Sequence, residues 1–331
     1  MSLNELEYAL TEALKRLRMA RIVATYQAGE EGLILPTYKG SLLRGAFGHA
    51  LRKMVCTCNG LHNDEHSANE KHEPDCVYGY IFEGNVSIDA VKQRGEVPRP
   101  IVMVPPLEKK QEYFPGETFS LTITLFGDSI SYLPYLFNVL ESMGENGLGK
   151  GRQHAGLRQV FRQDIHGEVW PIYDRRKRIL NTDETEFRAI DIVQQLNYRS
   201  DRLNVYFETP TRIQQMGQNV VTPEFHLIVR NLIRRLTSLL YFYHGQYRME
   251  IDFKQVFRDA ETVSLLHNET SWYDWERYSN RQKERMKLGG IIGKAVYEGT
   301  WQPFYLLVKL AEWIHVGKNP MFGLGKVKVF T

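Results

Sequence analysis

The chain has 331 residues, a formal net charge of +3 and a hydrophobic fraction of 43%, which is ordinary for a globular protein and excludes a histone-like basic tail protein. No run of about 18 uncharged apolar residues is present, so we expect no membrane span, and early charges argue against a signal peptide. Three cysteines are too few, and an odd count, for a disulfide scaffold, so we expect a cytoplasmic location.

The first half of the chain carries alternating helix and strand patterns. Apolar residues recur at helical spacing after Ser41, which we expect to be the N-cap of a helix that runs to Val55. Strict alternation of apolar and polar residues at 118–126 predicts a half-buried strand. The other expected elements are helices at 4–16 and 132–143 and strands at 19–28, 77–82, 101–105 and 159–163.

The second half repeats this order of elements. Its expected elements are strands at 203–208 and 326–330, helices at 223–243 and 303–314, and a paired hairpin of 272–278 with 286–298. Each half follows strand–helix–strand–strand–helix–strand, which is the order of the ferredoxin-like fold. We therefore expect an α+β protein with two ferredoxin-like (RRM-like) domains in tandem. Their expected bounds are 1–170, with a Cys/His loop insertion at 56–76, and 201–331, joined by a linker at 171–200.

Positive charge gathers in separate segments although the net charge is small. Residues 146–163, for example, hold four bases and no acid. Such clusters suit phosphate-rich ligands because each neutralised phosphate releases counterions, whereas the alternative is a solvated surface. The candidate phosphate contacts are Lys150, Arg152, His154, Arg158, Arg230, Arg234, Arg281 and Lys326.

A glycine-rich segment follows the last expected helix of each half, at 147–156 and at 317–325. Glycine permits a positive φ, and the N–H groups of such a loop form a concavity that suits phosphate. The alternative is a hairpin that only closes its domain. A dinucleotide-binding loop is excluded at 147–151, because that motif follows a strand and opens a helix, and here it follows a helix.

Both glycine-rich segments resemble the loops of the RAMP superfamily of CRISPR RNA-binding proteins. The segment Lys39–His49 and the glycines at 289, 290 and 293 are similar to the branch that processes CRISPR repeat RNA. The resemblance implies tandem ferredoxin-like domains and a metal-independent endoribonuclease that cleaves precursor CRISPR RNA within its repeats to give guide RNAs. Repeat RNA and CRISPR effector subunits are the implied partners, and a homodimer is left open. The alternative within the superfamily is a non-catalytic RNA-binding subunit of an effector complex.

His49 is the strongest candidate for chemistry. It lies off the apolar stripe of its helix, and Arg52 and Lys53 follow three and four residues later on the same face. Gly45 and Gly48 each cost a helix interior about 1 kcal/mol relative to Ala. We therefore expect a backbone or a ligand to approach the helix closely beside His49.

Cleavage of RNA without a metal ion requires the 2′-hydroxyl to lose a proton, the leaving 5′-oxygen to gain one, and cations to stabilise the charged phosphorus centre. Imidazole titrates near neutral pH, so we expect His49 to transfer the proton. We expect Lys53 or Arg52 to stabilise the negative charge on the phosphorus centre. The resemblance also implies an assisting tyrosine upstream of the histidine. Tyr38 and Tyr26 are both candidates for it.

A group of cysteines and histidines between residues 56 and 76 suggests a separate chemistry. Three thiolates and one imidazole make a closed tetrahedral zinc set. The expected ligands are Cys56, Cys58, Cys76 and His66, with His62 and His72 also in the segment. The alternatives are plain thiols in a solvated loop, or a zinc-stabilised protein-interaction domain in place of an RNA-binding one.

Overall fold

The structure is a computed structural model that describes residues 3–58, 72–84, 97–174, 179–193, 200–274, 276–279 and 284–331. Its contacts divide it into an N-terminal unit, Met19–Phe187, and a C-terminal unit, Met1–Arg18 with Arg188–Thr331. That 1–170 and 201–331 are separate domains stays a prediction. The contact units differ from them in placing the first helix with the C-terminal part of the chain.

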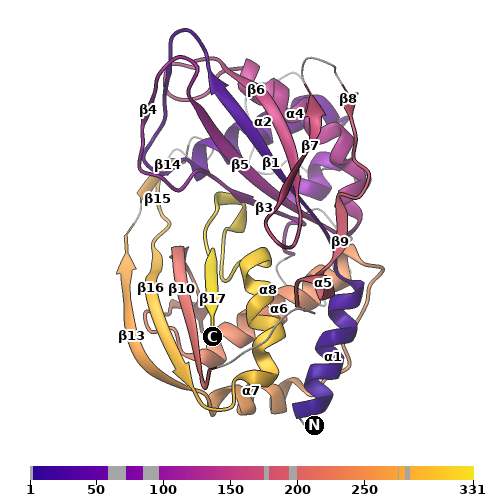
Figure 1. Cartoon of the computed structure of the whole chain (residues 1–331), viewed down its shortest axis with the longest axis vertical. Helices are drawn as coiled ribbons and strands as arrows, with labels where there is room; N and C mark the ends of the chain where they lie inside the picture. The colour runs from indigo at the N-terminus through magenta and orange to yellow at the C-terminus, as the bar shows by residue number, and fades with distance from the viewer. Residues whose placement is uncertain are drawn as a thin grey trace. The chain divides into compact units, whose positions relative to one another are not determined.

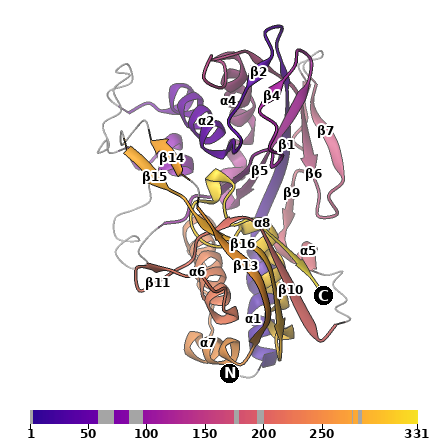
Figure 2. The same ribbon diagram turned by 90° about the vertical axis from the view of Figure 1, so that its left-hand side faces the viewer.

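The N-terminal unit is built on an antiparallel sheet in the order β3-β5-β1-β6-β7-β8, with β9 also paired to β1. The strands are β1 (Arg18–Ala28), β3 (Ile101–Val104), β5 (Thr118–Phe126), β6 (Ala155–Gln163), β7 (Val169–Asp174), β8 (Ile179–Leu180) and β9 (Glu186–Arg188). A small ribbon pairs β2 (Leu33–Ile34) with β4 (Glu112–Tyr113). Helices α2 (Gly40–Val55) and α4 (Leu133–Glu145) lie on one face of the sheet (Figure 2). The order of β3, β5, β1 and β6 is the ferredoxin-like arrangement.

Alternation along β5 explains how its sheet builds a core. Phe119, Leu121, Ile123 and Leu125 are buried, and the residues between the first three are half-buried, as the sequence pattern predicts. Tyr26 of the neighbouring β1 stacks on Phe119 with ring centroids 5.3 Å apart. The strand expected at 118–126 is therefore confirmed.

Helix α2 begins two residues earlier than its sequence predicts. The N-cap is Lys39, so the expectation of an N-cap at Ser41 is wrong. The ammonium of Lys39 is buried and donates to the backbone oxygen of Glu108 at 2.8 Å, which fixes the chain where the helix starts. Leu43 and Phe47 are among the residues of the expected apolar stripe that are buried, whereas Met54 is exposed.

The strand expected at 77–82 is wrong, because the chain is helical there and forms a turn of π-helix at η1 (Gly79–Glu83). The helical spacing places Tyr78 and Phe82 on one side, where their rings stack at 5.3 Å. Phe82 also packs against Phe47 of α2, with centroids 6.4 Å apart. In a strand Tyr78 and Phe82 would share a face but lie about 13 Å apart, at about 3.3 Å per residue, so only the helical turn lets their rings stack.

The C-terminal unit has an antiparallel sheet in the order β13-β16-β10-β17, which is again ferredoxin-like. The strands are β10 (Arg202–Thr211), β13 (Ser264–Tyr273), β16 (Gly290–Glu298) and β17 (Val327–Phe330), with short pairs β11 (Gln214–Gln215) with β12 (Gln218–Asn219) and β14 (Glu276–Ser279) with β15 (Glu284–Lys287). Both units thus have the expected fold.

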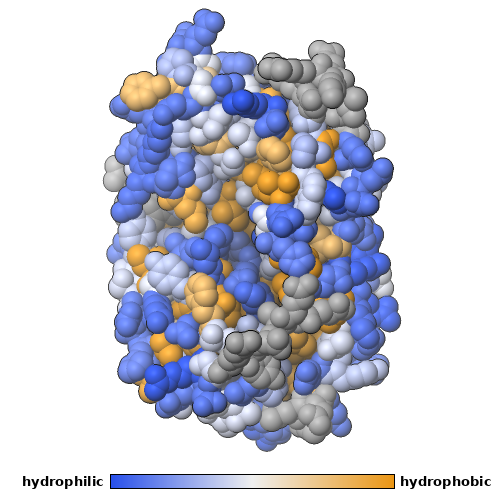
Figure 3. All heavy atoms as spheres, in the orientation of Figure 1, coloured by the Kyte–Doolittle hydropathy of each residue, from blue (hydrophilic) through white to orange (hydrophobic). Residues whose placement is uncertain are grey.

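Helices α6 (Phe225–Tyr243) and α8 (Tyr305–Ile314) pack together beside the C-terminal sheet (Figure 1). The other helices of this unit are α1 (Leu3–Arg16), α5 (Ala189–Val193) and α7 (Phe253–Glu261). None of the described helices is long and apolar enough to cross a membrane. Hydrophilic residues cover most of the face shown in Figure 3, and hydrophobic residues appear there in separate patches.

Candidate functional site

One face of α2 carries an exposed imidazole beside positive charge. The side chains of His49 and Lys53 are exposed and that of Arg52 is half-buried. Gly45 lies one turn before His49, and a Cβ built there would meet no described atom within 4 Å. This face is therefore open to solvent and cationic, and Gly45 leaves room for a ligand to approach the helix backbone.

Gly48 has a different role from Gly45. A Cβ at position 48 would lie 2.3 Å from Cζ of Phe82, a contact that no side chain tolerates without movement. The close approach expected beside His49 is thus made at Gly48 by the protein's own phenyl ring. The glycine holds the segment that contains η1 against α2.

The two tyrosines proposed to assist His49 lie in different environments. Tyr26 is fully buried, and its hydroxyl donates to the backbone oxygen of Leu140 at 2.9 Å, so Tyr26 is a core residue. Tyr38 lies just before α2 and is half-buried. Burial raises the pKa of the Tyr38 hydroxyl above its ordinary value, and the hydroxyl is protonated at neutral pH, as that of an unperturbed tyrosine also is.

The cations of the first glycine-rich loop are all accessible. Lys150, Arg152, His154 and Arg158 are exposed and belong to the loop before β6 or to β6 itself. No acidic residue lies between positions 146 and 163 of the chain. These side chains supply a local positive surface on the N-terminal unit.

The backbone of this loop is occupied by contacts within the protein. Leu148 and Gln153 exchange two backbone hydrogen bonds, and the N–H groups of Gly147 and Arg152 donate to carbonyl oxygens of the same loop region. Gly147 has a φ of +82°, and a Cβ there would lie 2.1 Å from the backbone oxygen of Arg152. The glycine therefore closes the hairpin, and those four N–H groups are not the expected phosphate cradle.

The second glycine-rich segment is packed in the same way. Gly325 has a φ of +76°, and a Cβ there would lie 1.8 Å from the backbone oxygen of Val316. The N–H of Gly317 donates to Oδ1 of Asn231 on α6 at 2.7 Å. This segment too is used to close its own unit.

The basic residues expected to bind phosphate in the C-terminal unit differ in their partners. Arg230 pairs with Glu261 at 3.3 Å, and Lys326 pairs with Glu208. Arg234 is exposed on α6, and Arg281 lies outside the described residues. Arg230 is exposed as well, so its pairing with Glu261, and not burial, limits it as a cation for phosphate.

The open face of the C-terminal sheet carries aromatic residues that the sequence patterns did not single out. Tyr206 on β10 and Phe330 on β17 are 46% and 53% exposed. Tyr206 lies opposite Lys328 and Lys294 in the two neighbouring strands. Alternation in β10, where Val205 and Phe207 are buried, was the signal that Tyr206 faces outward, and the alternation of β17 gives the same signal for Phe330. Exposed rings beside cations are suited to stacking on unpaired bases.

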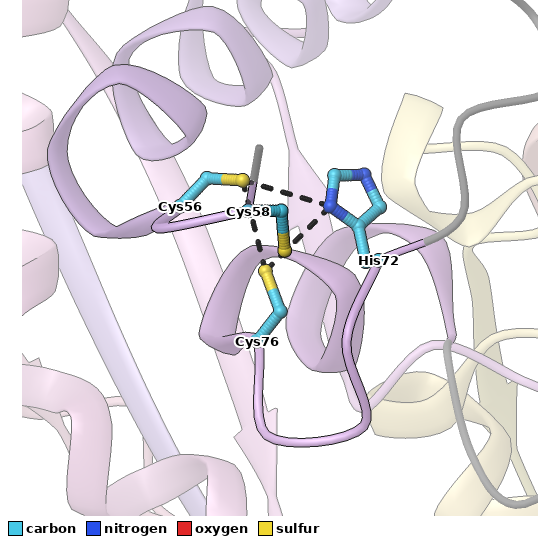
Figure 4. Close-up of side chains that lie close together, drawn as sticks. All are labelled: Cys56, Cys58, His72 and Cys76. Atoms are coloured by element: carbon cyan, nitrogen blue, oxygen red, sulfur yellow. Dashed lines mark hydrogen bonds between the residues drawn. The ribbon is translucent and has the colours of Figure 1, made fainter. Parts of the chain in front are cut away.

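Three cysteines and one histidine converge beyond the C-terminal end of α2 (Figure 4). The ligand atoms of Cys56, Cys58, His72 and Cys76 all lie within 4.8 Å of one another. The structure thus brings together the three expected cysteines with His72, whereas the expected His66 lies outside the described residues. The spacing His72-x₃-Cys76 falls within the range common among zinc ligands and was the signal that favours His72.

Comparisons with known proteins agree with this architecture. A family model described as CRISPR-associated endoribonuclease Cas6 matches residues 205–327, and an N-terminal domain model, AF_1859_N, matches residues 17–185. An uncharacterised protein of Archaeoglobus fulgidus is 33% identical over 305 residues, which are 89% of this chain and 92% of the relative.

Solved structures show the same fold. A Thermus thermophilus Cas6 in a product complex has a TM-score of 0.54 at 16% identity, over 94% of this chain and 100% of that one. A partial Cas6-RT-Cas1–Cas2 complex has a TM-score of 0.55 at 12% identity, over 95% of this chain and 46% of that one.

The tandem ferredoxin-like units, the glycine-rich segments and the Cas6 family match define a RAMP-type protein. Its residues 205–327 match the family of CRISPR-associated Cas6 endoribonucleases.

Proposed function

We propose that this chain cleaves precursor CRISPR RNA within its repeats and does so without a metal ion. The observation that carries the proposal is the exposed imidazole of His49 on a cationic face of α2, one turn after the open position Gly45. An exposed histidine can reach a bound ribose, and the neighbouring cations favour a phosphate there.

The proposed reaction is an internal transfer at phosphorus. The 2′-oxygen loses its proton to His49 and forms a bond to the adjacent phosphorus, while the bond from phosphorus to the 5′-oxygen breaks. The leaving 5′-oxygen gains a proton, for which the protonated hydroxyl of Tyr38 is the proposed donor. The products are a 2′,3′-cyclic phosphate and a 5′-hydroxyl, so no water or metal ion is consumed.

Lys53 and Arg52 are proposed to stabilise the charge that develops on the phosphoryl oxygens. Both follow His49 by about one helical turn, so the three side chains share one side of α2. The exposed Lys150, Arg152, His154 and Arg158 would hold the RNA backbone, with Arg234 as a further contact on the C-terminal unit. Arg230, Arg281 and Lys326 are further proposed contacts. Arg230 and Lys326 would exchange their acidic partners, Glu261 and Glu208, for phosphate, and Arg281 lies outside the described residues.

Repeat RNA is the proposed partner, and subunits of a CRISPR effector complex are further candidates, as one structural neighbour is a Cas6-RT-Cas1–Cas2 complex. A homodimer and a cytoplasmic location stay predictions. The cysteine–histidine cluster lies beyond the end of α2 and supplies no open coordination position for the reaction.

Cleavage of the repeat RNA encoded nearest this gene, in the presence of EDTA, tests the proposal. We expect one cut in each repeat and a 5′ fragment that ends in a cyclic phosphate, which acid converts to a monophosphate that phosphatase then removes. Tight binding without cleavage would instead identify a non-catalytic RNA-binding subunit. Cleavage that stops at once in EDTA would contradict the metal-free reaction.

A further inference from the structure

We infer that Cys56, Cys58, His72 and Cys76 form a structural zinc site that holds the C-terminal end of α2 (Figure 4). Two cysteines, Cys56 and Cys76, are buried, and Cys58 and His72 are half-buried. The four side chains come from two segments of the chain, one directly after α2 and one directly before the helical turn that contains η1.

The distances fit a tetrahedral zinc ion. Bond lengths of about 2.3 Å to sulfur and about 2.0 Å to nitrogen give tetrahedral edges of about 3.8 Å between sulfurs and about 3.5 Å between sulfur and nitrogen. Sγ of Cys56 lies 3.8 Å from Sγ of Cys76, and Nδ1 of His72 lies 3.6 Å from each of these sulfurs. Cys56, Cys76 and His72 therefore already have the spacing that the ion requires, and Sγ of Cys58 lies within 4.8 Å of all three ligand atoms.

The donor set selects the metal and its role. Three thiolates and one imidazole are soft and borderline ligands that suit Zn²⁺ and not Mg²⁺ or Ca²⁺. They fill all four positions of a tetrahedron, which is the pattern of structural zinc sites and leaves no position for a reacting water.

A disulfide accounts for the cluster less well. The sulfurs of Cys56 and Cys76 lie 3.8 Å apart, whereas a disulfide needs about 2.05 Å. No disulfide joins any of the three cysteines, all of which are described. A Cys56–Cys76 disulfide would also not explain why the side chains of Cys58 and His72 converge on the same point.

Backbone donors support the thiolates. The N–H of Glu73 points to Sγ of Cys58 at 3.4 Å, and the N–H of Gly79 points to Sγ of Cys76 at the same distance. Such N–H contacts orient metal-bound thiolates and spread their negative charge. They come from backbone next to the ligands, so the loop geometry itself is arranged around the sulfurs.

The site joins two segments that also meet beside His49. Cys56 is the C-cap of α2, and its N–H donates to the backbone oxygen of Arg52. Cys76 leads into the helical segment whose Phe82 packs against Gly48, next to His49. Zinc would thus fix the register between α2 and this segment, and it would position the helix that carries the proposed catalytic residue without taking part in the reaction.

The test is the metal content of the full-length chain, purified under reducing conditions and dialysed against metal-free buffer. We expect one zinc ion per chain by mass spectrometry, released in step with modification of the three thiols by a mercurial reagent. Replacement by Co²⁺ should give the intense visible bands of tetrahedral cobalt bound to thiolates. A folded chain that holds no zinc and takes up no cobalt would overturn the inference.

Variants identify the ligands. We expect Cys58→Ser and His72→Ala to lower zinc retention by tenfold or more in competition with a chelator, whereas His66→Ala keeps the wild-type retention. A tenfold loss of zinc retention in His66→Ala, together with wild-type zinc retention in His72→Ala, would overturn this ligand set. All of these measurements are made without RNA, so their outcome is independent of whether the chain cleaves repeats.

Discussion

Gly48 and Phe82 are in direct contact, so close that a Cβ on Gly48 would lie 2.3 Å from the phenyl ring. The guanidinium of Arg44 lies over the same ring, 4.3 Å from its centroid. Phe82 is 5% exposed, and the missing side chain of Gly48 leaves the space on α2 in which its ring packs. The exposed surface of α2 at Gly45 and His49 lies outside this contact.

The two glycines of α2 should respond in opposite ways to alanine. Gly48→Ala should lower the free energy of unfolding by about 1–3 kcal/mol, because the added methyl overpacks the contact with Phe82. Gly45→Ala should raise it by up to about 1 kcal/mol, because Ala is the better helix former and its methyl meets open space. Urea unfolding of both variants measures the difference. Equal destabilisation by the two substitutions would contradict the separate roles given to the glycines.

The alternation and helical spacing of the sequence predicted most of the fold, because both patterns report which side chains are buried. The strand at 118–126 and the helix at 132–143 show this, the first matching β5 and the second differing from α4 by one or two residues at each end. The segment 77–82 misled, since a short apolar run cannot distinguish a strand from a buried helical turn. Packing against α2 decides that this segment is helical, and the local sequence does not report that tertiary contact.

Tyr38 and Tyr26 should separate chemistry from stability. Tyr38→Phe should slow cleavage with little change in stability, because it removes the proposed proton donor. Tyr26→Phe should leave the cleavage rate unchanged and cost about 1 kcal/mol of stability, because it removes a buried hydrogen bond to Leu140. Single-turnover cleavage and urea unfolding of each variant measure the two effects. If Tyr26→Phe cleaved more slowly and Tyr38→Phe cleaved at the wild-type rate, Tyr26 and not Tyr38 would be the proton donor.

The glycine-rich loop should bind RNA through its side-chain charge. Lys150→Gln and Arg158→Gln should each weaken binding and lower the slope of log affinity against log salt by about 0.7, the value for one phosphate contact in a single strand. Lys15→Gln on α1 is the matched control, since Lys15 is an exposed cation paired with Glu12 and is not among the proposed RNA contacts. Salt-dependent binding of a repeat RNA measures the slopes. Wild-type slopes in both loop variants would contradict the proposed contacts of the loop.

Asp252 should make the stability of α7 depend on pH. Its carboxylate accepts the N–H groups of Gln255 and Lys254 at the start of the helix, and these bonds hold its pKa below the ordinary value. Because the pKa is lower in the folded state, the stabilisation is present above the unfolded value of about 3.9 and is lost as pH falls through the folded value. Wild type should exceed Asp252→Asn in stability at pH 7, and the gap should close in acid. A gap that does not change with pH would contradict the role of the charge.

The site was predictable from the sequence only in part. His49 was accessible to reasoning because its place off the apolar stripe of a helix implies exposure, which the structure shows. The different roles of Gly45 and Gly48 could not be predicted from the sequence, because they depend on where Phe82 packs. The glycine-rich loops were recognisable by pattern, but the occupation of their N–H groups depends on hydrogen bonds that only the folded hairpin defines.

Single-turnover cleavage of the cognate repeat RNA by His49→Ala in EDTA tests the central claim most directly. His166→Ala, which removes another exposed histidine in the turn before β7, is the matched control. We predict a rate about 10²–10⁴ times lower for His49→Ala, with unchanged RNA affinity and a wild-type rate for the control. A wild-type rate for His49→Ala would contradict the account.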